Sequence, residues 1–303
     1  MKKSPVHLPG NFYFDPAVVP IVLQKVRGKV LTHAHDYTGI SHWHDFSELV
    51  IITSGHGIHN VNGVSCPVSA GDVFVIGGNT THFFEEYSSL SISNLQFDPR
   101  LLEGMQEYLN RIPGYHVVFR FEPELRTSGN YHNSLHLSPQ DLSKVLQLTG
   151  EIDAELRQSR PGREAAAIGK LLELTVFLSR AQEEQSSESS RSAALARLAS
   201  LTSKLESSFQ EQWDLRRMAK ISGMSVNTLL RTFQTVIRQT PLQYLTSLRL
   251  NAAGSMLKNG TRAVSEIAFA CGFHDSNYFS KCFRKHFGCA PSAYRKGSAA
   301  EKN

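Results

Sequence analysis

The chain has 303 residues, of which 41% are hydrophobic, and its formal net charge is +5. This length and composition are typical of about two folded domains, and they exclude a fibrous or wholly disordered protein. No apolar run reaches the roughly 18 residues of a membrane-spanning helix, and residues 1–5 do not begin a secretory signal. We therefore expect a cytoplasmic protein with no membrane partner.

The charge is unevenly divided along the chain. Residues 1–200 hold 17 basic and 21 acidic side chains, whereas residues 201–303 hold 15 basic and 6 acidic ones. A basic third of a chain indicates either a surface that meets a polyanion such as nucleic acid or a solvated face without a partner. Charge alone leaves both interpretations open.

The first 182 residues predict an arm followed by a β domain with trailing helices. We interpret residues 1–30 as an N-terminal arm, although no motif in them requires it. Residues 49–52 and 73–76 are typical of buried strands, and Asn62-Gly63 predicts a tight hairpin. Short, evenly spaced strands favour a sandwich or small barrel. Residues 138–178 have a helical apolar period, so these helices pack against the barrel or against a second copy of the chain.

A polar segment separates this part from the rest of the chain. Residues 183–193 cannot bury apolar surface and are interpreted as a flexible linker. The predicted organisation is therefore an arm (1–30), a β domain (31–182), a linker (183–193) and a helical domain (194–303).

The helical domain contains an internal repeat. Three residues recur at an offset of 50, as Phe233/Phe283, Pro241/Pro291 and Tyr244/Tyr294. Each copy predicts a short helix, a turn at Gly223 or Gly272, an N-cap at Ser225 or Asp275, and a second helix. This is the helix-turn-helix pattern, present twice, and residues 241–259 predict a long helix that joins the copies.

The second helix of each copy has an apolar face and a polar face. Asparagine reads adenine, and arginine or lysine reads guanine or binds phosphate, so the polar faces suit the major groove of DNA. A joining helix of about 28 Å is close to the roughly 34 Å between successive groove faces. The residues predicted to contact DNA are Asn227, Thr228, Leu230 and Arg231 in the first copy and Ser276, Asn277, Tyr278, Ser280 and Lys281 in the second. Any one of them alone is more often an ordinary surface residue.

Residues 268–280 and 283–295 closely resemble the signature of AraC/XylS-type transcriptional regulators. The resemblance covers about the last hundred residues. It implies a two-repeat domain that binds double-stranded promoter DNA and recruits RNA polymerase. Homodimer formation is carried over by analogy, with residues 164–178 as the expected seam. One departure is Gln239, where the family usually has glycine, and this puts the local turn in question.

The β domain resembles a cupin barrel. Seven of the chain's 13 histidines lie within residues 33–82, and the HxH(x3)E(x6)G spacing of a cupin begins at His42. Residues i and i+2 of a strand share a face, so two of these imidazoles can point into one barrel mouth. An N3O set of this kind suits a divalent metal. The candidate metal ligands are His42, His44, Glu48 and His82.

A pocket for a small effector that needs no cofactor is an alternative to the metal, and purely structural histidines are another. Many regulators that this sequence resembles carry a cupin-like sensor without a metal. Residues 44–48, 57–62 and 93–95 look like the sensor half of the L-rhamnose-responsive activators, and carboxylates, amides and imidazoles bind sugar hydroxyls. The predicted effector-binding residues are His42, His44, Glu48, His59, His82 and Asn94.

The sequence thus predicts an α+β multidomain protein, with an N-terminal cupin-like barrel and a C-terminal all-α domain with two helix-turn-helix motifs. Its expected function is that of a DNA-binding transcriptional regulator, an activator that responds to a small molecule such as a sugar, and not that of an enzyme. The rival hypothesis is a metal-dependent cupin enzyme, an oxygenase or isomerase, with a helical appendage.

Overall fold

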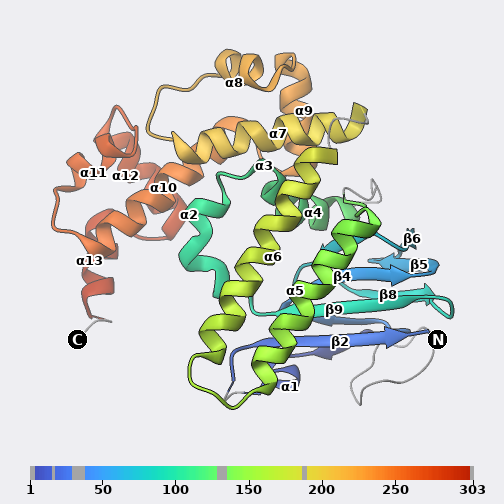
Figure 1. Cartoon of the computed structure of the whole chain (residues 1–303). Helices are drawn as coiled ribbons and strands as arrows, with labels where there is room; N and C mark the ends of the chain where they lie inside the picture. The colour runs from blue at the N-terminus through green and yellow to red at the C-terminus, as the bar shows by residue number, and fades with distance from the viewer. Residues whose placement is uncertain (1–3, 16–17, 29–37, 128–134, 186–189, 301–303) are drawn as a thin grey trace. The chain divides into compact units, whose positions relative to one another are not determined.

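The computed structural model describes residues 4–15, 18–28, 38–127, 135–185 and 190–300. The chain divides into two compact units, residues 1–199 and residues 200–303. The first unit is rich in strands and the second is helical, which confirms the predicted α+β class (Figure 1). Within the described residues, no helix combines the length and the apolar character that crossing a membrane requires.

Two sheets form the barrel of the first unit. One has the strand order β1-β3-β8-β5-β6 and the other the order β2-β9-β4-β7. The strands are β1 (Val6–Leu8), β2 (Ile21–Arg27), β3 (His42–His44), β4 (Ser47–Ser54), β5 (His56–Val61), β6 (Val64–Ser69), β7 (Val73–Ile76), β8 (His82–Glu86) and β9 (Ser91–Phe97). Residues of both sheets pack into one core between them, which includes Val50, Phe74 and Phe84.

The four-stranded sheet is buried on both faces. On β4, Val50 and Ile52 point into the core between the sheets, whereas Leu49 and Ile51 belong to a second core shared with the helices. A strand covered on both faces has apolar residues at every position, which explains the unbroken run that predicted it. The predicted hairpin is also confirmed, because β5 and β6 meet at Asn62-Gly63, both with positive φ.

Helices α5 and α6 cover the outer face of the four-stranded sheet (Figure 1). Ser138 caps α5 by accepting a hydrogen bond from the Asp141 backbone N–H at 3.1 Å. Buried residues of both helices, such as Val145 and Leu171, pack against the sheet. The helical elements of this unit are α1 (Gly10–Tyr13), η1 (Pro99–Met105), α2 (Gln106–Leu109), α3 (Pro113–Tyr115), η2 (His116–Phe121), α4 (Glu122–Thr127), α5 (Pro139–Arg157) and α6 (Arg163–Gln185).

Two predicted segments differ from the structure. The interpretation of residues 1–30 as an arm is wrong for residues 6–8 and 21–27, because β1 pairs with β3 and β2 pairs with β9 along its whole length. The predicted linker is shorter than expected, because α6 continues to Gln185 and α7 begins at Ser190. Glu183 also accepts a hydrogen bond from Gly114 N at 2.9 Å. The polar composition of this segment did not indicate these helices or this hydrogen bond. Residues 186–189 lie outside the described residues.

The second unit contains the predicted repeat. Helix α10 runs from Pro241 to Asn259, as predicted, and begins with a capping box between Thr240 and Gln243. The helices that end or lie in this unit are α7 (Ser190–Ser207), α8 (Leu215–Ser222), α9 (Val226–Val236), α10 (Pro241–Asn259), α11 (Val264–Ala270), α12 (Ser276–Phe287) and α13 (Pro291–Ala300). The pairs α8–α9 and α11–α12 are the two helix-turn-helix motifs, joined by α10.

Candidate functional site

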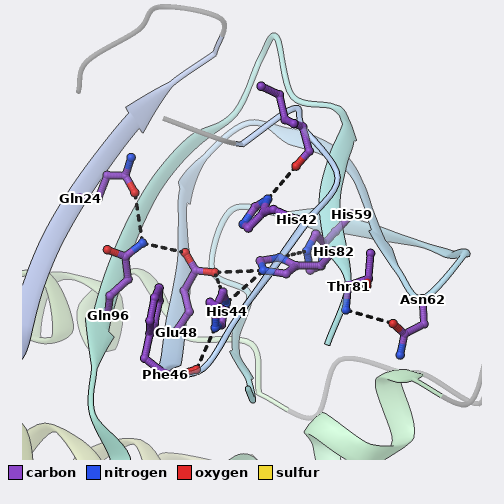
Figure 2. Close-up of polar contacts among 11 residues, drawn as sticks. Gln24, His42, His44, Phe46, Glu48, His59, Asn62, Thr81, His82 and Gln96 are labelled. Carbon is purple, nitrogen blue, oxygen red and sulfur yellow. Dashed lines mark hydrogen bonds and ion pairs between the residues drawn. The ribbon is translucent and has the colours of Figure 1, made fainter. Parts of the chain in front are cut away.

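The predicted histidines and Glu48 meet between the two sheets of the barrel (Figure 2). His42 and His44 lie on β3, His82 pairs with His42 from β8, and Glu48 lies on β4 of the other sheet. His82 Nε2 is 3.1 Å from His44 Nε2, and Glu48 Oε2 is 3.5 Å from His44 Nε2 and 3.6 Å from His82 Nε2. All four side chains are buried. The tertiary structure therefore brings the motif residues into one cluster.

Backbone carbonyls orient two of the imidazoles. His42 Nδ1 lies 2.6 Å from the Ile40 carbonyl, and His44 Nδ1 lies 2.8 Å from the Phe46 carbonyl. A carbonyl oxygen can only accept, so each Nδ1 carries a proton and donates it to that carbonyl, which leaves Nε2 facing the cluster. In metal sites, the same anchoring of the second ring nitrogen fixes a ligating histidine.

Burial and neighbouring charge set the ionisation of the cluster. Burial lowers the pKa of His82 well below its ordinary value, and the nearby imidazoles lower it further. Burial also lowers the pKa of His59. Burial alone would raise the pKa of Glu48, but the hydrogen bond from His44 and the charges of His44 and His42 leave that pKa lowered. The cluster thus combines several imidazoles with one buried carboxylate, a set that can bind hydroxyl groups or a cation.

A row of buried amides extends the cluster along the four-stranded sheet. Gln24 pairs with Asn94, and Gln96 pairs with Glu48. Gln96 Nε2 donates to Gln24 Oε1 at 3.3 Å and lies 3.5 Å from Glu48 Oε1 (Figure 2). Asn94 Oδ1 and Gln96 Oε1 are buried and make no hydrogen bond to the residues that the structure describes. Buried acceptors of this kind are costly unless a bound molecule supplies a donor.

Gln24 and Gln96 were not predicted from the sequence. Both were detectable in principle, because each is a polar residue on the same face of its strand as a buried apolar residue, Val26 two positions from Gln24 on β2 and Ile92 four positions from Gln96 on β9. A cavity of about 20 Å³ lies among these groups. Its lining consists of Tyr13, Gln24, Thr38, His42, Glu48, His82, Phe84, Asn94 and Gln96. Four predicted effector residues therefore line the cavity, whereas His44 and His59 contact His82 from outside the lining.

The second helices of the two motifs present matching polar faces. Asn227 and Arg231 are exposed on α9, and Asn277 and Lys281 are exposed at the equivalent positions of α12, together with Tyr278. The other predicted contact residues, Thr228, Leu230, Ser276 and Ser280, are half-buried. Two hydroxyls of this group are already bonded locally: Thr228 Oγ1 to Ser225 Oγ at 2.8 Å, and Ser280 Oγ to the Ser276 carbonyl at 2.8 Å. Arg284 and Lys285, which were not among the predicted contact residues, are exposed one turn beyond Lys281.

The turn after the first motif corrects one detail of the sequence analysis. Gly288 ends α12 with φ of +77°, and the residue 50 positions earlier, Arg238, has φ of +61°. The left-handed residue is therefore Arg238, and not Gln239 as the aligned signature indicated. An L residue can adopt this conformation only at a cost in free energy, which glycine avoids.

Comparisons with known proteins agree with this architecture. Residues 29–201 match the family model of the AraC-like ligand binding domain, and residues 218–297 match that of a helix-turn-helix domain. The chain belongs to the AraC family of transcriptional regulators. This assignment confirms the predicted pairing of a ligand-binding domain with a DNA-binding domain in one regulator.

Relatives of this AraC-family regulator cover most of its length. The HTH-type transcriptional activator RhaR of Mannheimia succiniciproducens is 29% identical over 254 residues, which are 84% of this chain and 86% of the relative. The activator RhaS of Escherichia fergusonii is 30% identical over 263 residues, 86% and 88% of the two chains. The DNA-binding domain of AdpA, solved with a target DNA, is 30% identical, with a TM-score of 0.34, and covers 35% of this chain and 95% of that one. Because the chain belongs to this family of regulators and the RhaR and RhaS relatives, which cover most of its length, are named transcriptional activators, it is not an enzyme, and the rival hypothesis of a cupin enzyme is set aside.

Proposed function

We propose that this regulator activates transcription in response to a polyhydroxylated molecule, a sugar such as L-rhamnose, bound in the barrel cavity. The supporting observation is the pair of buried amide oxygens without a hydrogen bond, Asn94 Oδ1 and Gln96 Oε1, whose residues line the same cavity as Glu48. Two hydroxyl groups of a sugar supply the two donors that these oxygens lack. The resemblance of the sensor half to the L-rhamnose-responsive activators favours the same class of ligand.

The size of the cavity links sugar binding to a change of conformation. A volume of about 20 Å³ holds about one water molecule, so a monosaccharide enters only when part of the lining moves outward. Tyr13 on α1 and Thr38 are the lining residues that lie outside both sheets. A ligand that binds only the opened cavity shifts the equilibrium toward that state, and this shift is the signal that the DNA-binding unit reads.

On the DNA, α9 and α12 occupy two neighbouring segments of the major groove of a promoter, with Arg231 and Lys281 at equivalent places. The exposed asparagines, Asn227 and Asn277, suit adenine. The regulator acts in the cytoplasm as a homodimer that recruits RNA polymerase. The side of residues 164–178 of α6 that is not buried against the sheet forms the dimer seam, and sedimentation equilibrium of the full chain measures the association.

A thermal-shift titration with L-rhamnose and a panel of monosaccharides tests the effector site. A sugar that binds the folded state raises the melting temperature by mass action. Asn94→Ala removes one acceptor, and loss of a buried hydrogen bond of roughly 1 kcal/mol weakens binding about fivefold. Asn60→Ala is the matched control, because Asn60 is also buried in the barrel but bonds Glu85 at 2.8 Å. The proposal fails if no sugar shifts the melting temperature of wild type, or if Asn94→Ala and Asn60→Ala weaken sugar binding equally.

A divalent metal ion is a second candidate for the ligand of this cluster. His42, Glu48 and His82 each offer a ligand atom within 4.8 Å of the others. In a tetrahedral site with ligands about 2.1 Å from the metal, neighbouring ligand atoms lie about 3.4 Å apart. The separations among His44, Glu48 and His82, from 3.1 to 3.6 Å, fit this geometry. These four residues would hold the ion, which would supply a fixed positive charge to bind an electron-rich ligand.

Calorimetric titration of the full chain with Zn²⁺ or Mn²⁺ tests this candidate. We expect binding in a one-to-one ratio that His82→Ala abolishes and His56→Ala preserves, because His56 is an exposed residue of β5. Repeating the sugar titration with a chelator then separates the two ligands, because a metal-free sugar site is insensitive to the chelator. Absence of metal binding, or equal binding by both variants, would exclude the metal.

A further inference from the structure

The segment between α7 and α8, residues 208–213, is folded onto the first helix-turn-helix motif. Trp213 is buried, and its indole Nε1 donates to the Ser208 carbonyl at 2.9 Å. The Arg217 guanidinium of α8 lies 4.1 Å from the centre of the Trp213 ring. The indole hydrogen bond closes the segment into a compact loop, and the ring contact attaches this loop to the start of the first motif.

The same segment also enters the second motif. Phe209 packs against the core of that motif, which includes Ile267, Phe279 and Phe283. The turn residue Gly272 has φ of +86°, and a Cβ at this position would lie 2.7 Å from the Gln210 carbonyl oxygen. Backbone of the 208–213 segment therefore touches the turn of the second motif, where no larger residue fits.

Arg249, on the joining helix α10, holds the segment in place. Its Nε donates to the Phe209 carbonyl at 2.8 Å, and its Nη2 donates to the Glu211 carbonyl at 2.8 Å. The guanidinium also lies 6.0 Å from the ring centre of Phe273 in the second motif. Two donors in a fixed plane can bind two carbonyls at once, a geometry that the single ammonium of lysine does not reproduce.

We infer that Arg249 is a positioning residue for DNA binding. By fixing the 208–213 segment between the two motifs, it sets the separation and relative rotation of α9 and α12. Helix α10 alone joins the motifs through short connections at residues 237–240 and 260–263, and backbone rotation in these connections would let each motif turn independently. The second attachment removes this freedom before DNA is bound, so both helices can enter one duplex without a further ordering cost.

The test uses a duplex selected by the wild-type full chain from a random library, and a shortened duplex that keeps one of its two groove segments. Arg249→Ala should weaken binding to the selected duplex about tenfold or more, because the advantage of simultaneous binding falls. Binding to the shortened duplex should change little. Wild type should also discriminate sharply against one inserted base pair between the segments, and the variant should not.

Two controls separate positioning from charge. Lys258→Ala removes a positive charge from the same helix, so it should weaken binding to both duplexes equally. Arg249→Lys keeps the charge but loses the planar pair of donors, so it should behave like Arg249→Ala. If Arg249→Ala does not fold, Gln212→Ala removes only a side-chain contact with His274 and should relax the spacing preference in the same direction. Equal losses on both duplexes, or an unchanged spacing preference, would overturn the inference.

Discussion

The two helix-turn-helix motifs share one pattern but differ in what completes them. Phe233 and Phe283 are both fully buried at equivalent positions, and both turns contain a glycine with positive φ. The second motif, however, takes Phe209 into its core from outside the repeat and ends at Gly288, whereas the first ends at the strained Arg238. The two copies therefore share their local helix signals but differ in the packing at their ends.

The largest expected effect comes from truncating the central phenylalanines. Phe283→Ala and Phe233→Ala should each lower the free energy of unfolding by about 3–5 kcal/mol. Phe283 should be at the upper end, because its ring lies 4.5 to 5.5 Å from three aromatic rings, whereas Phe233 lies 5.8 Å from Tyr244 alone among the aromatic contacts described. Urea unfolding followed by circular dichroism measures both values, and equal losses would contradict this ranking.

The next comparison concerns the two polar faces. Arg231→Ala and Lys281→Ala should each weaken binding to the selected duplex by about 1–3 kcal/mol, with little change in melting temperature, because both side chains are exposed. Fluorescence anisotropy at one fixed salt concentration gives the affinities. If only one variant loses affinity, a single motif reads the DNA and the symmetric interpretation is wrong.

The N-caps predict a difference in acid sensitivity. The backbone N–H groups of Tyr278 and Asn277 hold the pKa of Asp275 below its ordinary value, whereas the equivalent cap, Ser225, does not titrate. A lowered pKa in the folded state stabilises the protein above the unfolded-state pKa, and this stabilisation is lost as the pH falls through the folded-state pKa. Asp275→Ser should therefore remove part of the acid destabilisation seen in urea unfolding between pH 5 and pH 2, relative to wild type. If the free energy of unfolding falls equally with pH in wild type and Asp275→Ser, this role of Asp275 is contradicted.

The smallest expected effect is a gain in stability. Arg238→Gly gives the first motif a terminal glycine, as Gly288 is in the second motif. This substitution should raise the free energy of unfolding by up to about 1 kcal/mol. The gain is limited because glycine also has more freedom in the unfolded chain. Gly288→Arg is the reciprocal variant and should destabilise. Thermal melting measures the stability of both variants. A lowered melting temperature for Arg238→Gly would show that the arginine makes a compensating contact.

Much of the DNA-binding unit was predictable from sequence because its signals are local. The caps at Ser225, Thr240 and Asp275 and the apolar spacing of α9 and α12 each depend on residues within a few positions of one another. The barrel was predicted less completely. The HxH spacing located one face of β3, but the arm hypothesis failed because the partners of β1 and β2 lie far along the chain.

The sequence by itself determined that the chain has two helix-turn-helix motifs and a histidine-rich β domain, since periodicity, caps and motif spacing are properties of neighbouring residues. Only the tertiary structure decided that Gln24 and Gln96 join the histidine cluster, that Phe209 and Arg249 connect the two motifs, and that Arg238 carries the left-handed turn. These features depend on strand register and on side-chain packing between distant segments. No local pattern specifies such contacts, because their free energy arises only when the segments meet.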